Sequence, residues 1–280
     1  MRVALLVLLL SFAAPSFAED SKLKYPDTRR VDQTDDFHGV KVADPYRWLE
    51  NDARTSQEVA DWITAENKVT RAYLDAIPEL PDIRKTLADM WNFERYSAPW
   101  QEGGRYFYSK NDGLQNQSVL YTAADPAGTG RVLLDPNTLS PDGKLAFAGI
   151  ELSEDGTRMA YGLSQGGGDW MTWRLREVAT GKDLPDELPY IKYYQPVFTR
   201  DGKGIYYSRF PAPPPGKELV ETDHDCKVYF HRLGTPIQSD VVIYERPEKP
   251  TWQFDLERTR DGRYLVVTIG DGQVGDRGQE

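Results

Sequence analysis

Two hydrophobic patterns divide the sequence, and the first is helical. Between residues 55 and 91, apolar residues recur every three or four positions, the spacing of an amphipathic helix. Thr55 and Glu58 form a capping-box pattern at its start, and Pro78 ends it. A shorter helix is predicted after Pro81, which gives a helical hairpin. Its polar face is mixed in sign, so we interpret the pair as packing helices rather than as a membrane-surface element.

After Trp91 the pattern changes to short runs of Tyr, Val, Ile and Phe separated by Gly- and Pro-containing turns. No helical crossover separates these runs. A parallel α/β sheet is therefore excluded for this part, because each parallel crossover needs about a dozen residues. The predicted strands are Arg105–Ser109, Ser118–Thr122, Arg158–Leu163, Thr172–Glu177, Gly204–Arg209, Lys227–Arg232, Val241–Glu245 and Tyr264–Ile269.

A repeat distinguishes among the all-β architectures. The pattern Ser/Thr-x-Asp-Gly followed by a strand begins at Ser153, Thr199 and Thr259. Each Gly favours a tight turn, and each interval holds about four strand-sized runs, the content of one β-propeller blade. Generic β-hairpins are the alternative. We expect about three blades between residues 93 and 250 and the beginning of a fourth, hence a mainly β fold with a partial β-propeller.

The first residues have the features of an export signal. Arg2 precedes an apolar run, and small residues at Ser16 and Ala18 form a cleavage site. The run is too short to cross a bilayer as a helix, and no other stretch approaches that length. We expect three parts: a signal peptide at 1–18 cleaved after Ala18, an amino-terminal segment with the helical hairpin at 19–92, and an incomplete propeller at 93–280. The protein is then periplasmic or secreted.

The composition narrows the range of partners. The formal net charge of -10 argues against nucleic-acid and anionic-membrane partners. Cys226 is the only cysteine, so no intrachain disulfide can form, and the 12% aromatic content must supply a packed core. The sequence leaves open whether Cys226 is an exposed free thiol or a buried side chain.

Several ordered segments resemble one enzyme family. Asp44–Glu50, preceded by Phe37-His38-Gly39, is similar to the amino-terminal signature of prolyl oligopeptidases. Further similar segments follow in order from about Tyr25 to the end of the chain. They are Gly162–Ser164 leading to Gly168–Trp170, then Phe198–Gly204, and then Tyr229–Thr235. Asn51 departs from the family, which more often has an acid there.

The resemblance implies a seven-bladed propeller covering an α/β-hydrolase domain, on which the amino-terminal segment packs. It implies a serine endopeptidase that cleaves short peptides after proline, with the propeller gating access and with no cofactor. The serine, aspartate and histidine of the triad would belong to the carboxyl-terminal hydrolase, so we expect this chain to be inactive alone. Its partners would be short proline-containing peptides and that hydrolase domain. A non-catalytic β-propeller binding module is the alternative.

One substrate-binding residue is carried over from the resemblance. In the family an aromatic side chain of the propeller reaches the substrate pocket, and Ile191–Tyr194 lies about where that residue would fall. Tyr193 is the candidate. Ordinary packing within a blade is the alternative.

Other motifs suggest chemistry that their context does not support. Gly162–Gly166 fits the Gly-x-Ser-x-Gly nucleophile elbow, but a strand rather than the required helix is predicted after it. Gly270–Gly275 fits a dinucleotide fingerprint, again with no helix following. Asp223–Cys226 offers four adjacent donors without the separated pairs of a zinc site, so no metal is predicted. Among the histidines, His231 lies in a strand pattern and is predicted to be a packed or an edge residue.

Overall fold

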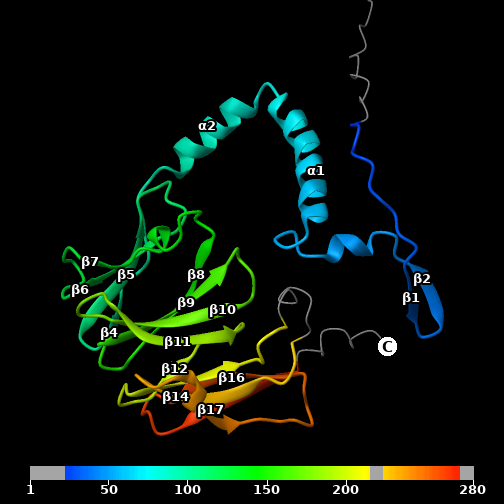
Figure 1. Cartoon of the computed structure of the whole chain (residues 1–280). Coiled ribbons are helices and arrows are strands. Elements are labelled where there is room, and N and C mark those ends of the chain that lie inside the picture. The colour runs from blue at the N-terminus through cyan, green and yellow to red at the C-terminus, as the bar shows by residue number, and fades with distance from the viewer. Residues whose placement is uncertain (1–22, 215–222, 272–280) are drawn as a thin grey trace, which may run out of the picture. The chain divides into compact units, whose positions relative to one another are not determined.

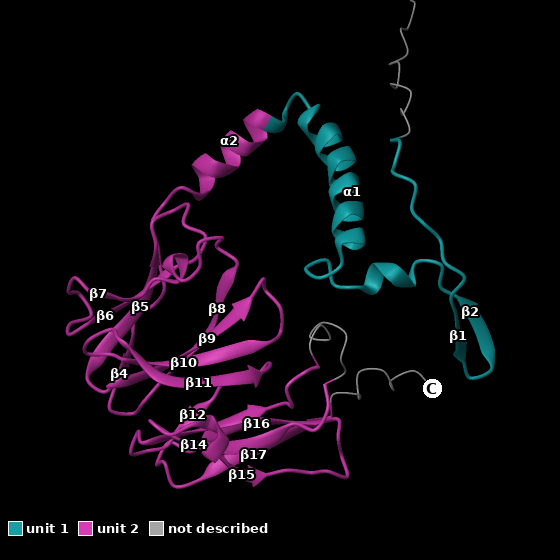
Figure 2. Cartoon of the chain, in the orientation of Figure 1, with its two compact units in different colours: residues 1–80 teal, residues 81–280 magenta. Residues whose placement is uncertain are grey.

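The computed structural model describes residues 23–214 and 223–271. The chain divides into two compact units, residues 1–80 and 81–280, and Figure 2 colours them separately. The predicted signal peptide at 1–18 lies outside the described residues. Within the part that the structure describes, no helix is long and apolar enough to span a membrane.

In the first unit, the Asp44–Glu50 segment organises the residues around it. A short hairpin of β1 (Thr34–Phe37) and β2 (Val40–Ala43) leads into the 3₁₀ helix η1 (Arg47–Glu50) and then α1 (Gln57–Asp75). Trp48 is 8% exposed, its indole Nε1 donates to the Arg29 carbonyl at 2.8 Å, and its ring meets Trp62 of α1 edge-on at 6.4 Å. These contacts fix the turn-rich segment to the helix and explain the cluster of aromatic and charged residues there.

The start of α1 differs from the prediction. Its N-cap is Ser56, whose hydroxyl accepts from the Val59 amide at 3.5 Å, and not Thr55. Thr55 instead donates its hydroxyl to the Asp52 carbonyl at 3.3 Å. Glu58, the expected capping-box partner, instead accepts two hydrogen bonds from the Arg29 guanidinium, with N–O distances of 2.7 and 3.0 Å. The capping-box assignment was therefore wrong, because a tertiary ion pair removes its acidic residue.

The second predicted helix is α2 (Leu80–Trp91), which begins one residue before Pro81. It lies in the second unit apart from Leu80. Its apolar stripe is exposed in this structure, with Ile83, Leu87, Met90 and Trp91 between 49% and 66% accessible. The helical hairpin therefore stays a prediction.

The rest of the second unit is built from antiparallel sheets that follow one another along the chain (Figure 1). The first sheet contains β3 (Arg95–Tyr96), β4 (Trp100–Glu102), β5 (Arg105–Asn111), β6 (Val119–Ala123) and β7 (Arg131–Leu134). The second sheet contains β8 (Leu145–Leu152), β9 (Arg158–Gln165), β10 (Met171–Glu177) and β11 (Asp183–Ile191). The third sheet contains β12 (Val197–Phe198), β13 (Gly204–Arg209), β14 (Lys227–Arg232) and β15 (Val241–Tyr244), and the fourth contains β16 (Trp252–Arg258) and β17 (Leu265–Asp271). Two short 3₁₀ helices, η2 (Pro136–Thr138) and η3 (Ile237–Ser239), lie in connections.

All eight predicted strands are present, to within a few residues at their ends. The mainly β fold is therefore confirmed. Three strands of seven residues or more were missed, namely β8, β11 and β16. Pro185 and Pro189 argue against a strand, but β11 is an edge strand, where a missing amide is tolerated. In β8, small residues and a register shift next to Gly149 interrupt the alternation.

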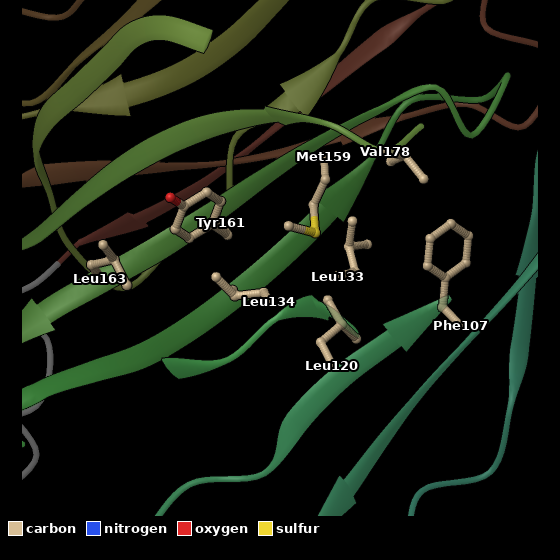
Figure 3. Packing of buried hydrophobic residues seen from close by; sticks show 8 residues of the cluster. All are labelled: Phe107, Leu120, Leu133, Leu134, Met159, Tyr161, Leu163 and Val178. Carbon is tan, nitrogen blue, oxygen red and sulfur yellow. The ribbon is translucent and has the colours of Figure 1, made fainter. Parts of the chain in front are cut away.

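Consecutive sheets pack face to face through three apolar cores. Figure 3 shows the core between the first and second sheets, where Phe107, Leu120 and Leu134 meet Met159 and Tyr161. The second core lies between the second and third sheets and the third core between the third and fourth. Their central members are Trp173, Leu175, Leu188, Phe198, Ile205 and Tyr207 in the second, and Val197, Phe210, Val228, Phe254 and Leu256 in the third.

The predicted Asp-Gly turns join the first two strands of the second, third and fourth sheets. We call them the second-sheet turn (Ser153–Gly156), the third-sheet turn (Thr199–Gly202) and the fourth-sheet turn (Thr259–Gly262). In each, the Gly has φ between +63° and +67°, and the Asp carboxylate accepts the hydroxyl of the first residue at 2.6–2.7 Å. The turn chemistry predicted from the sequence is confirmed.

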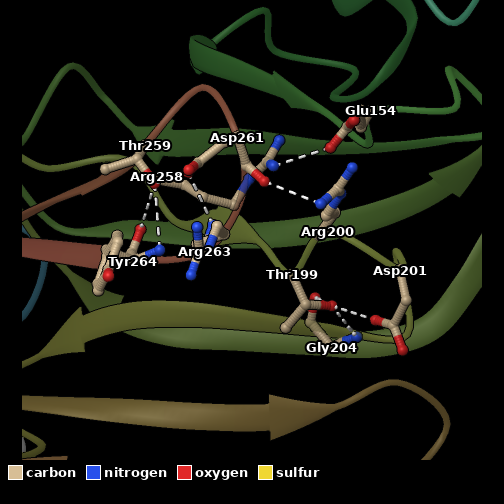
Figure 4. Close-up of polar contacts among 10 residues, drawn as sticks. All are labelled: Glu154, Thr199, Arg200, Asp201, Gly204, Arg258, Thr259, Asp261, Arg263 and Tyr264. Atoms are coloured by element: carbon tan, nitrogen blue, oxygen red, sulfur yellow. Dashed lines mark hydrogen bonds and ion pairs between the residues drawn. The ribbon is translucent and has the colours of Figure 1, made fainter.

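Three arginines link these turns to one another, and Figure 4 shows two of them, Arg200 and Arg258. Arg158 donates to the Gly202 carbonyl of the third-sheet turn at 3.1 Å. Arg200 donates to the Asp261 carbonyl of the fourth-sheet turn at 2.9 Å. Arg258 of the fourth sheet pairs with Glu154 of the second-sheet turn at 2.8 Å. The second and fourth sheets are thus tied together across the third.

Candidate substrate-contact site

The candidate residue Tyr193 lines an open hollow of about 680 Å³ in the second unit. The hollow takes residues from β8 and β16 and from the connection between β11 and β12. Its lining consists of Glu151, Tyr193, Tyr194, Gln195, Pro196, Val197, Asp255, Leu256, Glu257 and Arg258. We call this the Tyr193 hollow. It is mostly polar, with one aromatic pair at its edge.

Tyr193 is held in an unusual backbone conformation. Its φ is +62°, and Tyr190, three residues earlier, has φ +61°. The left-handed region costs a residue with a Cβ about 1–2 kcal/mol, so it persists only where surrounding contacts enforce it. The ring of Tyr193 is 51% exposed and lies at 6.4 Å from that of Tyr194, nearly perpendicular to it. The side chain is therefore presented to solvent rather than packed within a sheet.

The contact that fixes Tyr193 comes from a distant segment. Its phenol donates to Asp223 Oδ2 at 2.8 Å, and the neighbouring Lys192 donates its ammonium to the other oxygen of the same carboxylate. Lys192 is only 6% exposed, and its Nζ lies 4.0 Å from the centre of the Trp170 ring. Partial burial and the hydrogen bond to Asp223 raise the pKa of Tyr193 above its usual range. Tyr193 is consequently a neutral hydrogen-bond donor at physiological pH.

The Trp170 ring that faces the buried ammonium is itself packed against two other aromatic rings. The Trp170 ring meets Tyr190 and Phe210 edge-on at 6.3 and 6.2 Å. A ring face attracts a cation, and a desolvated pair of this kind contributes about 2 kcal/mol. Lys192 is thus stabilised by an aromatic face and one carboxylate, and both come from outside its own segment.

Among the charged residues that line the Tyr193 hollow, carboxylates outnumber cations. Burial raises the pKa of Glu151 to about 7; Arg258 opposes this rise and Glu102 adds to it. Asp255 and Glu257 project from β16 and are exposed. Glu151 is therefore partly protonated near neutral pH, and Arg258 is the one cationic side chain among the described residues that line the hollow.

The Gly-x-Ser-x-Gly motif has the geometry of a hairpin. Ser164 lies in β9, is 4% exposed and donates its hydroxyl to the Gly168 carbonyl. Gly166 and Gly167 form the turn that leads to β10, with φ of +62° and +74°. A nucleophile elbow needs a helix at this point and an exposed hydroxyl. The predicted hairpin is confirmed, because the strand β10 and not a helix follows the motif. Of the Gly270–Gly275 motif, only the first two residues are described, at the end of β17.

The remaining chemically active side chains have structural environments. His231 is 1% exposed, with its Nδ1 at 2.7 Å from Asp240 and its Nε2 at 3.0 Å from Asp186, so the prediction that it is packed is confirmed. Cys226 is buried in the third core, and burial raises the pKa of its thiol to about 12. In the part of the chain that the structure describes, no group of three or more His, Cys, Asp or Glu side chains could hold a metal ion.

Sequence reasoning missed the partners of Tyr193. Lys192 and Asp223 are 31 positions apart, and no local pattern connects them. Asp223 was considered only as part of a run of possible metal donors. The one local signal was a lysine with Tyr190, Ile191, Tyr193 and Tyr194 around it in the sequence, since a lysine among large apolar side chains needs a partner for its charge when it is buried.

Comparison with known proteins agrees with this architecture. Residues 26–276 match the family described as "Prolyl oligopeptidase, N-terminal beta-propeller domain". The chain belongs to the prolyl oligopeptidase family, in the region of its amino-terminal propeller domain.

Individual relatives support the same assignment. The prolyl endopeptidase of Elizabethkingia meningoseptica is 38% identical over 275 residues, which cover 98% of this chain and 38% of that protein. Prolyl oligopeptidase A of Galerina marginata is 35% identical over 277 residues, covering 88% of this chain and 37% of that protein. A solved structure of prolyl oligopeptidase B from Galerina marginata, bound to a 35mer hydrolysis and macrocyclization substrate, superposes with a TM-score of 0.75 at 31% identity over 88% of this chain and 37% of that one. The chain therefore spans less than two fifths of the length of these relatives.

Proposed function

We propose that this chain is the amino-terminal and propeller part of an exported serine-type prolyl oligopeptidase that cleaves short peptides after proline. The observation that carries the proposal is the family match over residues 26–276, strengthened by 38% identity to a prolyl endopeptidase across nearly the whole chain. The chemistry would be serine acyl transfer with histidine as the base, performed by a hydrolase domain elsewhere in the whole protein.

In this proposal the four sheets are three to four of seven blades, and they gate access to the hydrolase. Two features support it. The sheets pack face to face in chain order, and their turns are tied to one another by Arg158, Arg200 and Arg258. A ring of such sheets would admit short, flexible peptides and exclude folded proteins.

A peptidase assay tests the proposal. We expect the purified 280-residue chain to leave a proline-containing chromogenic peptide uncleaved, and the product of the full reading frame to cleave it with sensitivity to a serine-directed inhibitor. Inhibitor-sensitive turnover by the 280-residue chain would overturn the assignment of the triad to another domain. Peptide binding without cleavage by the full product would instead support a non-catalytic propeller module.

Tyr193 is the proposed substrate contact. Its half-exposed ring and enforced backbone are what a residue presented to a ligand requires. We expect Tyr193→Ala to raise KM of the full enzyme about tenfold, since an aromatic contact contributes about 1 kcal/mol or more, with kcat changed much less. An unchanged KM would remove Tyr193 from the binding site.

Export is the remaining part of the proposal and is tested separately. It is supported by the charge, apolar run and small residues of positions 1–18. Intact-mass analysis of protein from the periplasm or medium should show a mature form that begins at Glu19. A form retained in the cytoplasm with residues 1–18 attached would contradict it.

A further inference from the structure

Two adjacent side chains of residues 190–194, which we call the Tyr193 segment, bind the same carboxylate. Asp223 accepts the phenol of Tyr193 on one oxygen and the ammonium of Lys192 on the other. Asp223 lies between β13 and β14, whereas Lys192 and Tyr193 follow β11. Asp223, whose side chain is 18% exposed, thus links the residues after β11 to the connection between β13 and β14.

The backbone of the Tyr193 segment needs such a tie. Two residues, Tyr190 and Tyr193, occupy the left-handed region, and Asp225, two residues after Asp223, does so with φ +56°. Residues other than glycine rarely adopt this region, so the three positions persist only where surrounding contacts enforce them. Without a tertiary contact, this segment would relax to an ordinary extended conformation, and the Tyr193 ring would turn away from its present position.

The charge of Lys192 makes the tie specific. Its ammonium is nearly fully buried against Trp170, and a buried charge requires a partner. Of the carboxylates in the described residues, Asp223 is the one that pairs with it. The requirement of Lys192 for a counter-charge holds the carboxylate in place, and the second oxygen is then fixed in position to accept the phenol.

We infer that Asp223 is the positioning residue of the substrate-contact site: anchored by Lys192, it holds the phenol of Tyr193 so that the ring stands at the edge of the Tyr193 hollow. This inference rests on the proposed role of Tyr193 in contacting peptide. Asp223 itself acts through Tyr193 and not on the substrate.

Nuclear magnetic resonance on the 280-residue chain, labelled with ¹³C at tyrosine Cζ, reads the phenol directly. Tyr193→Phe assigns the resonance. In the wild type we expect the phenol to ionise well above the ordinary tyrosine value of about 10, whereas in Asp223→Asn it should ionise at a lower pH than in the wild type and show a changed chemical shift, because the hydrogen bond to a carboxylate is lost. Asp225→Asn is the matched control, because this neighbouring carboxylate is exposed, bonds His224 and should leave Tyr193 unchanged. A Tyr193 resonance that is the same in the wild type and Asp223→Asn overturns the inference.

A second variant guards against loss of folding. Asp223→Asn leaves the buried ammonium without a counter-charge, so Lys192→Met/Asp223→Asn removes both charges while keeping a side chain of similar length. We expect this double variant to fold and to show the same change at Tyr193. A double variant with the wild-type Tyr193 resonance would overturn the inference even if the single variant unfolds.

Peptide titration separates this inference from the proposed function. A short proline-containing peptide should shift the Tyr193 resonance of the wild type, and Asp223→Asn should weaken that binding about tenfold with no further loss on adding Tyr193→Ala. If peptide leaves the wild-type resonance unmoved, the proposed role of Tyr193 fails, and the positioning by Asp223 is decided by the pH titration alone. If Tyr193→Ala weakens binding and Asp223→Asn does not, the proposed function stands and the positioning role fails.

Discussion

At the residue scale, the ionisable side chains in the interior of the second unit differ in whether they have a hydrogen-bonded partner of opposite type. Lys192 and His231 lie against carboxylates, whereas Glu151 is partly buried without a paired cation, and this burial raises its pKa. The contacts of Lys192 and His231 stabilise the packing of one sheet on the next. The raised pKa of Glu151 makes the free energy of unfolding depend on pH.

Glu151 gives a prediction about that pH dependence. Its pKa rises from the ordinary 4.5 to about 7 on folding, so between these values the folded chain binds more protons than the unfolded chain and the free energy of unfolding falls as pH rises. Glu151→Gln should therefore be more stable than the wild type by about 2–3 kcal/mol at pH 8 and nearly equal to it at pH 4.5. Urea denaturation at the two pH values measures this, with the exposed Glu257→Gln as control. A difference independent of pH would contradict the assignment.

His231 gives a prediction about stability alone. Its ring separates two carboxylates that are 1–2% exposed, Asp186 of the second sheet and Asp240 of the third. His231→Ala would remove one hydrogen-bond partner from each buried carboxylate, leaving the Gly234 amide on Asp186 and the Tyr207 hydroxyl on Asp240. It should cost about 3–5 kcal/mol, because each hydrogen bond to a carboxylate contributes about 1.5–3 kcal/mol. The exposed His224→Ala should change the free energy of unfolding by less than about 0.5 kcal/mol. Equal effects of the two substitutions in urea denaturation would show that the buried cluster adds nothing.

At the element scale, two factors set the cost of replacing a glycine in a tight turn. They are the backbone conformation of the turn and the distance to the neighbouring sheet. Gly156 and Gly166 have nearly the same φ, +65° and +62°. A Cβ on Gly156 would stand 2.7 Å from the Glu102 carbonyl of the first sheet, whereas a Cβ on Gly166 would meet nothing within 4 Å. The pair therefore separates conformational strain from the approach of two sheets.

We expect Gly166→Ala to cost about 1 kcal/mol, from the left-handed backbone alone. Gly156→Ala should cost about 1–3 kcal/mol more, because the first-sheet backbone has to move away. Chemical denaturation of both variants gives the difference. Similar losses would show that the first and second sheets adjust to each other freely at this turn.

The same elements show how far the sequence could be read. Alternating Tyr, Val, Ile and Phe located the eight strands, because each strand has at least one face in a core. The proline-containing edge strand β11 was missed, since its pairing to β10 is not visible in local sequence. Ser140–Gly143 also fits the repeated turn pattern and precedes β8 with Gly143 at φ +68°, yet it lies at the start of the second sheet rather than between its first two strands.

For the candidate site, the sequence supplied Tyr193 through resemblance but not the reason for its position. That reason lies in Asp223, thirty residues away, and in a backbone conformation that tyrosine does not favour. Propensity rules describe what residues prefer, so a conformation imposed by tertiary contacts is the kind of feature that they miss.

At the scale of the whole molecule, the sheets of the second unit differ in whether an apolar core covers one face or both. The second sheet has apolar cores on both faces, whereas in the described residues the fourth sheet has a core on one face and β17 pairs only with β16. Tyr264, Val266 and Ile269 are between 42% and 63% exposed. Burial on both faces makes a strand open only with the whole unit, while a strand covered on one face can open locally.

Hydrogen exchange should therefore show a gradient from sheet to sheet. We expect the amides of β9 and β10 to exchange only through global unfolding, with the strongest protection in the chain, because they lie centrally in the second sheet between two cores. The amides of β16 and β17 should exchange earlier and with a weak dependence on denaturant, which marks local opening. Uniform protection across the second and fourth sheets would mean that the whole unit opens in one step. The number of faces that a core covers would then not determine how easily a sheet opens. The third sheet, which has a core on each face, is expected to follow the second, so the step in protection should fall between β15 and β16.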